Sequence, residues 1–404
     1  MSTTNNDFDA LSLRVSTVFS PAAPINLQEL FAGRMEQLNK IADVINQRGQ
    51  HAIVFGERGV GKTSLANIIT AIFRQGNFYT VKVNCDSSDN YESTWRKVFA
   101  QIKISKKDFS MVFGKNPQVE LFDITEHYSI LTPENIRQIL ITLSEQAALL
   151  IVLDEFDRIN DQISKTMLAD TIKTLSDESI NVTLTLVGVA DSVDELIDQH
   201  QSIERALVQI QMPRMSQSEL NEIFDKGLPK LGMTIDDNAK NRISHLSQGL
   251  PHYTHLMGLH SARQALLEKT KNISLNHVKK AIEKSLSEAQ ESIQRGYHKA
   301  IMSPQRDNIF KEVLLACALA KSDNLGYFAP ADVREPLRKI KNKSYEIASF
   351  ARHLYDFCEA VRGPILQRTG KRRGFRYRFI NPLMQPYVTM QGFATGLLSE
   401  DFLS

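Results

Sequence analysis

The stretch that decides the fold is a glycine-rich octapeptide, Gly56-Glu57-Arg58-Gly59-Val60-Gly61-Lys62-Thr63. It follows the apolar residues 52–55 directly, and residues 64–73 continue with apolar side chains at helical spacing. A strand, a G-x-x-x-x-G-K-T loop and a helix in this order predict a phosphate-binding loop. Glycines let the backbone curl so that its N–H groups point at a phosphate, and the helix N-terminus adds partial positive charge. We therefore expect the octapeptide, together with Ser64, to hold the phosphates of a nucleotide.

A pair of acidic residues ends a second apolar strand further along the chain. Residues 149–153 are apolar throughout, and Asp154 and Glu155 follow directly. We expect Lys62 to reach the β- and γ-phosphates, while Thr63 ligates Mg²⁺ and Asp154 holds it through water. Glu155 would orient and activate the attacking water. Two acids at this point favour a nucleotide hydrolase over a protein that only binds nucleotide.

Length and composition predict a folded protein of several domains. The chain has 404 residues, of which 42% are hydrophobic and 23% charged, and this balance argues against a disordered chain. At roughly 100–200 residues per domain, two to four domains are expected. The longest apolar run, residues 313–320, is too short for a membrane helix, and the N-terminus lacks a secretory signal. Three widely spaced cysteines predict neither a disulfide framework nor a cysteine zinc site, so we expect a cytoplasmic protein without membrane contact.

Short apolar strands alternate with helical stretches in the first half of the chain. Strands are expected at residues 52–55, 79–84, 149–153 and 182–187, and a helix at residues 33–48. Buried strands separated by helices predict an α/β domain whose parallel sheet is covered on both faces. Residues 1–25 begin polar and end in a proline-containing stretch, which predicts a loosely held arm.

From residue 216 to about residue 300 the pattern is helical throughout. The last long helix of this region is expected to begin after Ser274, which would act as its N-cap. One face of that helix carries apolar side chains at helical spacing, namely Val278, Ile282, Leu286, Ala289 and Ile293. We expect this region to form an all-helical domain.

Residues 306–390 have the element order of a winged helix-turn-helix. Helices are expected at residues 308–319, 330–340 and 344–361, followed by hairpin strands at residues 364–368 and 375–380. Pro330 is placed to start the second helix, and Pro336 should kink or shorten it. The third helix carries one apolar face, formed by Ile347, Phe350, Leu354, Phe357, Cys358 and Val361. The predicted division is an N-terminal arm (1–30), an α/β nucleotide-binding domain (31–215), a helical lid (216–303) and a winged helix (304–395).

Charge is distributed unevenly along the chain. Residues 301–404 carry 16 Lys and Arg against 10 Asp and Glu, whereas the first 300 residues carry 32 against 36. The hairpin region 371–378 concentrates five of these cations, Lys371, Arg372, Arg373, Arg376 and Arg378, and its aromatic residues alternate with arginines, so one face is aromatic and the other basic. Such a wing would contact the DNA backbone, with binding that falls steeply as salt rises.

The exposed face expected for the third helix is poorly suited to reading bases. It offers Ser349, Arg352, His353 and Asp356, of which the aspartate opposes phosphates. Any DNA contact should therefore be made mainly to the backbone and be weakly sequence-specific. A solvated basic face would produce the same composition, and a protein contact through this unit remains an open alternative.

The motifs resemble those of the AAA+ ATPases, in particular the origin-recognition and replication-initiator branch and the related STAND ATPases. The resemblance runs from about residue 31 to about residue 388 and implies ATP hydrolysis with Mg²⁺. Phe31-Ala32-Gly33-Arg34 is similar to the family segment that packs beside the adenine, so Arg34 joins the expected binding residues. Val83-Asn84-Cys85 is similar to a strand end whose asparagine restrains the catalytic glutamate until a partner engages. Asn84 is the candidate for this role, although a strand-ending turn residue would look the same.

Other positions match the family less closely. Asp191 stands where the resemblance implies an asparagine or threonine that monitors the γ-phosphate. Arg205 stands where an arginine finger would reach a neighbouring subunit's nucleotide, with Arg214 as second choice; a surface arginine paired with an acid is the alternative for both. Pro251 resembles the STAND proline that packs on the base, and no sensor-2 arginine stands near it, since Arg263 comes too late in the helix.

Three functional interpretations follow from this pattern. The first is an ATP-dependent switch that positions a basic winged helix on DNA. The second is a STAND-like signalling or defence ATPase that assembles with or controls a partner effector protein. Besides ATP, the expected partners are DNA through residues 371–378, and a homo-oligomer or an effector protein. The third is an ATP-locked scaffold with negligible turnover.

Overall fold

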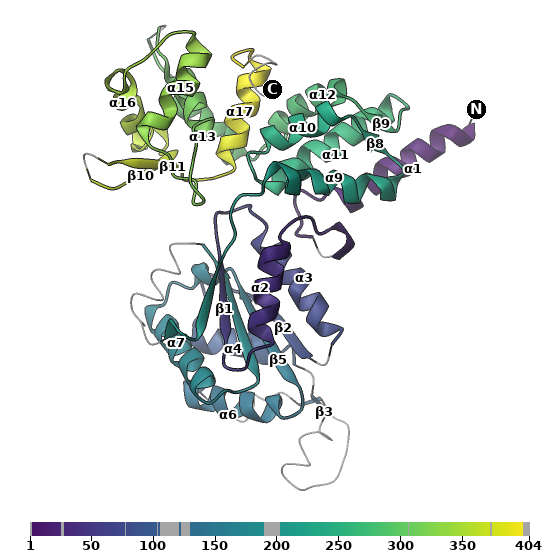
Figure 1. Ribbon diagram of the computed structural model, residues 1–404, viewed down its shortest axis with the longest axis vertical. Coiled ribbons are helices and arrows are strands. Elements are labelled where there is room, and N and C mark those ends of the chain that lie inside the picture. The colour runs from purple at the N-terminus through teal and green to yellow at the C-terminus, as the bar shows by residue number, and fades with distance from the viewer. Residues whose placement is uncertain are drawn as a thin grey trace.

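The computed structural model describes residues 2–25, 28–76, 78–102, 104–105, 121–122, 130–189, 203–305, 307–371 and 374–398. An α/β body forms one part of the molecule, and a layer of helices from the rest of the chain lies across one end of it (Figure 1). The junction between body and layer is where the candidate site lies.

Five parallel strands form the central sheet of the body. They are β1 (His51–Phe55), β2 (Phe78–Asn84), β5 (Ala148–Asp154), β6 (Val182–Gly188) and β7 (Leu207–Gln211). Their spatial order is β2-β5-β6-β1-β7, and every pairing is parallel. The four predicted strands are confirmed. The fifth, β7, was not predicted, because its sequence alternates apolar residues with glutamine, as suits an edge strand, and lacks a continuous apolar run.

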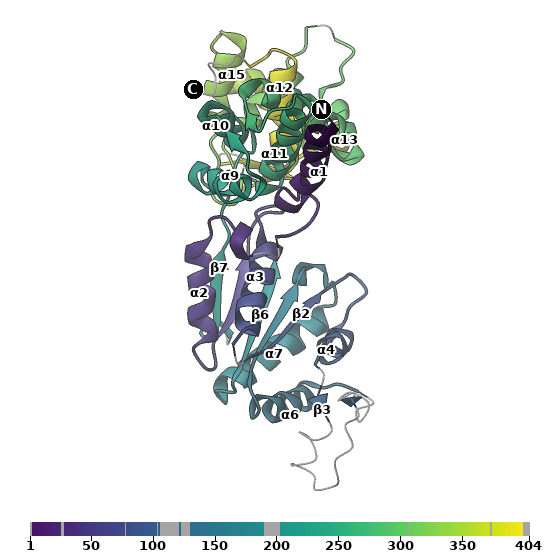
Figure 2. The ribbon, with the colours of Figure 1, turned by 90° about the vertical axis from the view of Figure 1, so that its right-hand side faces the viewer.

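Helices cover both faces of this sheet, as predicted. Helices α2 (Met35–Ile45) and α3 (Lys62–Arg74) pack on one face, whereas α4 (Tyr91–Phe99), α6 (Pro133–Ser144) and α7 (Gln162–Asp177) lie on the other (Figure 2). A second small pair, β3 (Ile104–Ser105) and β4 (Leu121–Phe122), is antiparallel. Because all five strands of the main sheet run parallel, their carboxyl ends meet at one edge, and this edge faces the helical layer.

The helical layer begins with four helices and a short strand pair. These are α9 (Gln217–Leu231), α10 (Asp237–Leu246), α11 (Pro251–Leu267) and α12 (Leu275–Ser287), with β8 (Thr234–Ile235) parallel to β9 (Asn272–Ile273). The predicted single long helix after Ser274 is wrong, because it breaks into α12 and α13 (Glu291–Ile301). The Gln294 side chain donates to the carbonyls of Ser287 and Ala289, at 3.4 and 2.8 Å, and so satisfies groups that a continuing helix would have used.

The N-terminal segment is a packed helix and not a loosely held arm. Helix α1 (Ser2–Val18) lies against α9 and α11. Its buried side chains Leu11, Val15 and Val18 follow helical spacing, and Phe19 is fully buried after them. The Phe19 ring centroid lies 5.6 Å from that of Phe224 in α9. The polar start of the sequence hid this short apolar stripe from the prediction.

The C-terminal unit contains the predicted three helices and hairpin. They are α14 (Phe310–Ala318), α15 (Pro330–Lys341) and α16 (Ile347–Asp356), with β10 (Leu366–Thr369) antiparallel to β11 (Arg376–Phe379). Two expectations about these helices are wrong. Helix α15 continues past Pro336 to Lys341, and α16 ends at Asp356, which leaves Val361 83% exposed outside the apolar face.

The side-chain environment of the C-terminal unit also differs in part from the prediction. Tyr377 and Phe379 are buried, which confirms the aromatic face of the hairpin. His353 is not on the exposed face of α16, since its ring packs on Phe310 with centroids 4.5 Å apart. A final helix, α17 (Met384–Ala394), was not predicted and packs against α12, α13 and α14. Helix α17 therefore joins the C-terminal unit to the rest of the helical layer.

The cysteines and the helix lengths bear on the expectations drawn from composition. Cys85, Cys317 and Cys358 are unpaired. Burial raises the pKa of the Cys85 thiol to about 12, which makes it a poor nucleophile. None of the helices in the described ranges is long and apolar enough to cross a membrane.

Candidate nucleotide-binding site

A cavity of about 960 Å³ opens between the carboxyl edge of the sheet and the helical layer. Its walls come from the segment 20–25, residues 30–34, the glycine-rich loop, the Asp154-Glu155 pair, the start of α11 and Leu383. The glycine-rich loop and the acidic pair come together here because β1 and β5 both end at this edge. The predicted residues from Arg58 to Ser64, with Arg34, Pro251, Asp154 and Glu155, all line this cavity. Its volume lies within the range of small-molecule and cofactor sites.

The glycine-rich loop has the backbone curl that its sequence predicts. Gly59 and Gly61 have φ angles of 89° and 97°, which side chains with a Cβ rarely adopt. Gly61 caps the N-terminus of α3. The Lys62 ammonium lies back over the loop and donates to the carbonyls of Gly56 and Glu57, at 2.9 and 2.8 Å. Burial lowers the pKa of Lys62 to about 8, so a phosphate would offer this group a compensating charge.

Asp154 is buried and contacts three neighbours. Thr63 Oγ1 lies 3.4 Å from Asp154 Oδ1, and the Glu155 N–H donates to the same oxygen at 3.0 Å. Lys82, on β2, places its Nζ 3.0 Å from Oδ2. The Thr63 hydroxyl and the Asp154 carboxylate are hard oxygen donors of the kind that suits Mg²⁺. Among the described residues no group of three His, Cys, Asp or Glu side chains is placed to hold a metal ion, so the remaining ligands of an Mg²⁺ at Thr63 and Asp154 would come from phosphate and water.

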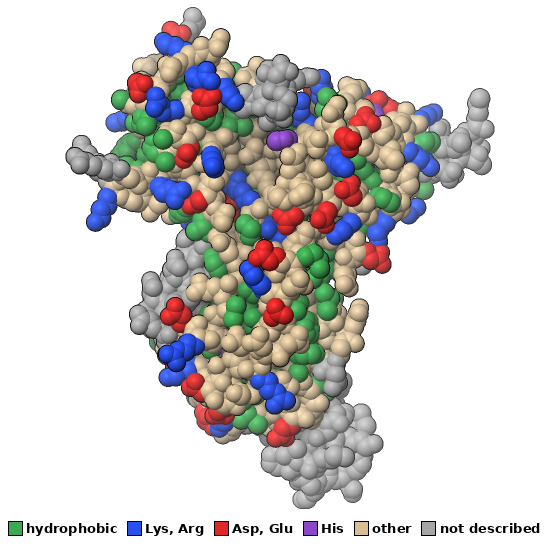
Figure 3. Space-filling model, in the orientation of Figure 1, with side chains coloured by type: hydrophobic (Ala, Val, Ile, Leu, Met, Phe, Trp, Pro, Cys, Tyr) green, Lys and Arg blue, Asp and Glu red, His purple; other side chains and the backbone are tan. Residues whose placement is uncertain are grey.

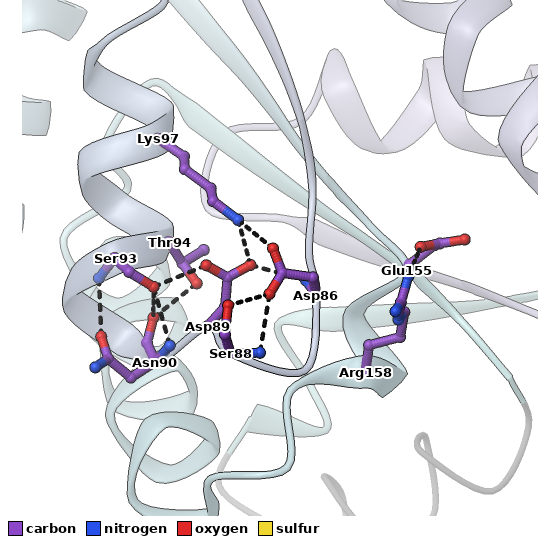
Figure 4. Close-up of polar contacts among 9 residues, drawn as sticks. All are labelled: Asp86, Ser88, Asp89, Asn90, Ser93, Thr94, Lys97, Glu155 and Arg158. Carbon is purple, nitrogen blue, oxygen red and sulfur yellow. Dashed lines mark hydrogen bonds and ion pairs between the residues drawn. The ribbon is translucent and has the colours of Figure 1, made fainter.

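Glu155 faces away from this cluster. Its φ of 56° places it in the left-handed region, and its carboxylate pairs with Arg158 at 3.0 Å, with both side chains about half exposed. Figure 4 shows this pair next to the turn after β2, where Lys97 bridges Asp86 and Asp89. Asn84 lies beside Asp154 in the strand register. Within the described residues no hydrogen bond joins Asn84 to Glu155, so the restraining contact implied by the resemblance is not formed in this conformation.

The segment 31–34 is fixed to helix α9 and to the phosphate loop. The backbone N–H groups of Gly33 and Arg34 donate to Glu222 and Glu219, at 3.0 and 3.1 Å. The buried Arg34 guanidinium donates to the carbonyls of Val60 and Pro213, at 3.2 and 2.5 Å. Arg34 therefore lines the cavity but also ties the phosphate loop to the connection that leads into the lid.

The opposite wall is formed by the start of α11. Pro251 is the first residue of the helix, and His252 Nδ1 lies 2.8 Å from the carbonyl oxygen of Pro21. Burial lowers the pKa of His255 to about 4 and also lowers that of His252. Both imidazoles are therefore neutral at physiological pH and would not act as phosphate cations. The N–H of Ile25 donates to Ser64 Oγ at 3.1 Å, so the N-terminal segment closes over the start of α3.

A buried charge pair connects the phosphate loop with both helical units. Arg214 Nε lies 2.8 Å from Glu57 Oε2, and the two side chains are only 15% and 7% exposed. Arg214 Nη1 also donates to the backbone carbonyl of Gln248 in the lid, at 3.2 Å, and to the side-chain oxygen of Gln385 in α17, at 2.7 Å. A Cβ on Gly326, in the C-terminal unit, would lie inside the Glu57 carboxylate. Because these contacts use the Arg214 guanidinium inside the chain, Arg214 is not available to reach a neighbouring subunit.

Arg205 does not line this cavity, and neither do the predicted residues Gly56, Glu57 and Asn84. Arg205 is exposed in the turn that precedes β7, and this turn is at the amino-terminal edge of the sheet, opposite the phosphate loop. It could therefore act only on a nucleotide held by another copy of the chain. Asp191 lies outside the described residues.

Comparison with known proteins agrees with this geometry. Residues 45–197 match the family model described as an AAA domain. No curated protein sequence matches the chain.

Two solved structures have the same fold as the whole chain. One is the Walker-type ATPase PABY2304 of Pyrococcus abyssi, with 14% identity over 92% of this chain and 99% of that chain, at a TM-score of 0.50. The other is the ORC2 protein of Aeropyrum pernix in ADPNP-ADP complexes, with 14% identity over 95% and 98%, also at 0.50. At this identity the likeness shows only that the α/β body and the helical units after it share an architecture with these two proteins.

Several residues around the AAA domain's loop were missed by sequence reasoning. Lys82 stands two positions before Asn84 on a strand, so both side chains lie on the same face. This spacing is the sequence feature that could have placed Lys82 near the site. Gln385 and Leu383 belong to a helix and turn that carry no motif, and nothing in the sequence places them beside residue 57. Their positions depend on how the C-terminal unit docks.

The depressed pKa of Lys62 predicts a pH dependence of ATP binding. Below pH 8 the ammonium is charged, whereas above it the free AAA domain loses this proton and must regain it to bind phosphate. ATP affinity should therefore fall by up to about tenfold per pH unit as pH rises above 8. Titration of a fluorescent ATP analogue between pH 7.5 and 9.5 measures this fall. The Lys62→Arg variant, whose guanidinium stays charged, should have a flat profile, and a wild-type profile equally flat would contradict the assignment.

Proposed function

We propose that the protein is an ATP-hydrolysing switch whose nucleotide state positions the C-terminal unit, residues 304–395, as a winged helix on DNA. The α/β nucleotide-binding domain would span residues 31–215 and the helical lid residues 216–303, with residues 1–30 as the N-terminal arm. The observation that carries this proposal is the buried bridge from Glu57 in the phosphate loop through Arg214 to Gln385 in α17. A nucleotide in the loop cannot change the conformation of residue 57 without changing this contact.

The phosphate loop residues Gly56 to Ser64 would hold the triphosphate, with Lys62 as its main cation. Arg34 and Pro251 would lie on the side of the base. The fit of Thr63 and Asp154 to Mg²⁺ supports a metal at this point, which would neutralise phosphate charge when bound. Glu155 would hold the attacking water once its carboxylate leaves Arg158. Arg205 of a neighbouring copy, and Asn84 within the chain, are the proposed groups that make hydrolysis depend on assembly.

The coupling follows from what the loop contacts in the present conformation. Lys62 donates to the carbonyls of Gly56 and Glu57, and an arriving β-phosphate would draw this ammonium away from them. Leu383 lines the same cavity, and a Cβ on Gly59 would lie 3.2 Å from its Cδ2 atom. Phosphate binding would therefore rearrange the backbone on which both Leu383 and the Glu57–Arg214 pair rest.

Nucleotide binding and hydrolysis can be separated by two substitutions in the AAA domain. Lys62→Ala removes the phosphate cation and should weaken ATP binding by at least about tenfold, since a charged hydrogen bond is worth roughly 1.5–3 kcal/mol. Glu155→Gln should keep binding but lower turnover by roughly 10²–10⁴-fold. Fluorescent-nucleotide titration and phosphate release measure the two effects. Equal turnover in Glu155→Gln and the wild type would show that Glu155 is not the base, and negligible wild-type turnover with tight binding would identify an ATP-locked scaffold.

Hydrogen exchange tests the proposed coupling to α17. An ATP analogue should speed amide exchange in Met384–Ala394, because it loosens the contacts of Leu383 and Gln385. Arg214→Ala should give fast exchange there already without nucleotide, since it removes the bridge. Gln391→Ala is the matched control on the same helix, because among the described residues the side-chain amide of Gln391 donates only to the Tyr387 hydroxyl, at 2.9 Å. If the amide exchange rates of α17 in the wild type are the same with and without the ATP analogue, the coupling is refuted.

The proposed DNA contact rests on the basic hairpin. Lys371 is exposed at its described end, and Arg368 lies over the rings of Tyr355 and Phe375, at 5.1 and 4.5 Å. Arg376 pairs with Asp323 at 3.0 Å, which reduces its value as a phosphate cation. In the view of Figure 3, Lys and Arg side chains on this unit are interspersed with Asp and Glu. These features favour modest backbone contact over base reading.

A STAND-like signalling ATPase is the second candidate, and one specific observation favours it. The C-terminal unit rests directly on the phosphate loop, with Gly326 against Glu57 and Leu383 above Gly59. Such docking is what an inhibited state would require, in which nucleotide exchange releases the unit to contact an effector protein. This candidate shares the ATP switch and differs in what the released unit binds.

Salt-titrated DNA binding distinguishes the two candidates. Reversing three hairpin charges in the full chain, with Lys371→Glu, Arg372→Glu and Arg373→Glu together, should weaken duplex binding and lower the salt slope by about 3. Arg295→Glu on α13, where the side chain is 74% exposed, is the control for charge reversal away from the hairpin. Equal loss in both variants would exclude the hairpin. Absence of DNA binding, with a stoichiometric protein recovered from the native host in a pull-down that retains nucleic acid, would favour the signalling candidate.

A further inference from the structure

The residue that contacts the far oxygen of the Asp154 carboxylate is a lysine with no assigned role. Lys82 Nζ lies 3.0 Å from Asp154 Oδ2, and the lysine and aspartate side chains are 17% and 3% exposed. Oδ2 accepts no hydrogen bond from any described group, so its contact with Lys82 is an ion pair alone. The near oxygen, Oδ1, contacts Thr63 and the Glu155 N–H instead. The two oxygens of one carboxylate are therefore divided between a candidate metal ligand and a fixed cation.

The strand register explains why Lys82 reaches this carboxylate. Asn84 is the register partner of Asp154, and Lys82 stands two residues earlier on the same strand, opposite Val152. Side chains two residues apart share one face of a strand. Val81 and Val83 point into the core on the other face. Lys82 is thereby directed to the face covered by α3, whose first turn carries Thr63.

The buried Asp154 carboxylate needs a nearby positive charge, which Lys82 supplies. An unpaired carboxylate in a buried site is strongly unfavourable, and next to a bound triphosphate it would also repel the phosphate oxygens. A divalent metal at Thr63 and Asp154 would cancel both effects. Among the described residues, Lys82 is the cation that forms an ion pair with Asp154.

We propose that Lys82 is a positioning residue that takes the place of the divalent cation beside Asp154, so that the AAA domain can hold nucleotide without metal. This inference rests on the proposed nucleotide-binding function and adds a property to it. Lys82 keeps Oδ1 turned toward Thr63 and keeps the net charge beside the phosphates neutral. The charge of the Asp154 carboxylate is then already compensated by Lys82 before metal binds, so nucleotide can bind without metal.

The test compares ATP-analogue affinity with Mg²⁺ and with EDTA in the full chain. The variant Lys82→Met should lose at least about tenfold in affinity in EDTA, because Asp154 is left uncompensated. In saturating Mg²⁺ it should stay within about threefold of the wild type, since the metal supplies the missing charge. Lys82→Arg, which keeps the charge, should restore binding in EDTA. In an Asp154→Asn background Lys82→Met should have no effect on metal dependence.

Lys97→Met is the matched control. Lys97 pairs with Asp89, whose side chain is 3% exposed, and with Asp86, at 2.6 and 2.8 Å. The Lys97→Met substitution also removes a lysine from a buried carboxylate. Lys97 lies on α4 and its two partners lie in the turn after β2, and none of the three lines the cavity. Its ratio of affinities in Mg²⁺ and EDTA should equal that of the wild type.

The outcomes separate this inference from the function on which it rests. Thermal unfolding first verifies that each variant is folded, and Lys82→Gln replaces Lys82→Met if the latter is not. A loss of equal size in Mg²⁺ and EDTA would mean a purely structural role and would overturn the inference. Unchanged affinity in both conditions would overturn it as well, while leaving nucleotide binding intact. A wild-type chain that binds no ATP analogue in Mg²⁺ would instead overturn the proposed function, and this inference with it.

Discussion

The buried contact between Glu57 and Arg214 is the constraint on which the arrangement of this molecule depends. It places a carboxylate of the phosphate loop and a guanidinium of the body-to-lid connection at 2.8 Å, with both nearly excluded from water. Both residues are partly buried, so removing one partner would leave the other charge poorly compensated and would destabilise this arrangement. Since Arg214 also reaches Gln248 and Gln385, the same cation holds the lid and the C-terminal helix against the loop.

Two further ion pairs engage the acidic residues of the candidate site. Lys82 compensates Asp154, and Arg158 engages Glu155. Lys62, which has a depressed pKa, rests on the carbonyls of its own loop. Lys62, Asp154 and Glu155 therefore each have an internal partner in this conformation. A bound phosphate or metal would therefore have to replace these internal contacts. Their loss is how ligand binding can be transmitted to the helical layer.

Much of the α/β body could be predicted from the sequence because its determinants are local. The run Gly56 to Thr63 requires its curl, since Gly59 and Gly61 adopt positive φ, and the buried run before Asp154 has to be a central strand. The long helix proposed after Ser274 failed for the opposite reason. An apolar stripe is continuous across residues 278–293, but the helix is interrupted between α12 and α13, where the Gln294 side chain donates to the free carbonyls. The spacing of apolar residues in a sequence does not reveal such side-chain hydrogen bonds. Helix α1 was missed because its stripe is short and its start is polar.

What the sequence by itself determined is the phosphate loop, the acidic pair, the parallel sheet and the order of helices and hairpin at the C-terminus. These depend on residue types at fixed spacing, and backbone geometry leaves them few alternatives. Only the tertiary structure decided that Leu383, Gly326 and Gln385 lie on the phosphate loop, that Arg214 is used inside the chain, and that Lys82 faces Asp154. Those contacts join residues far apart in the sequence, and they form because buried charges must find partners wherever packing brings them together.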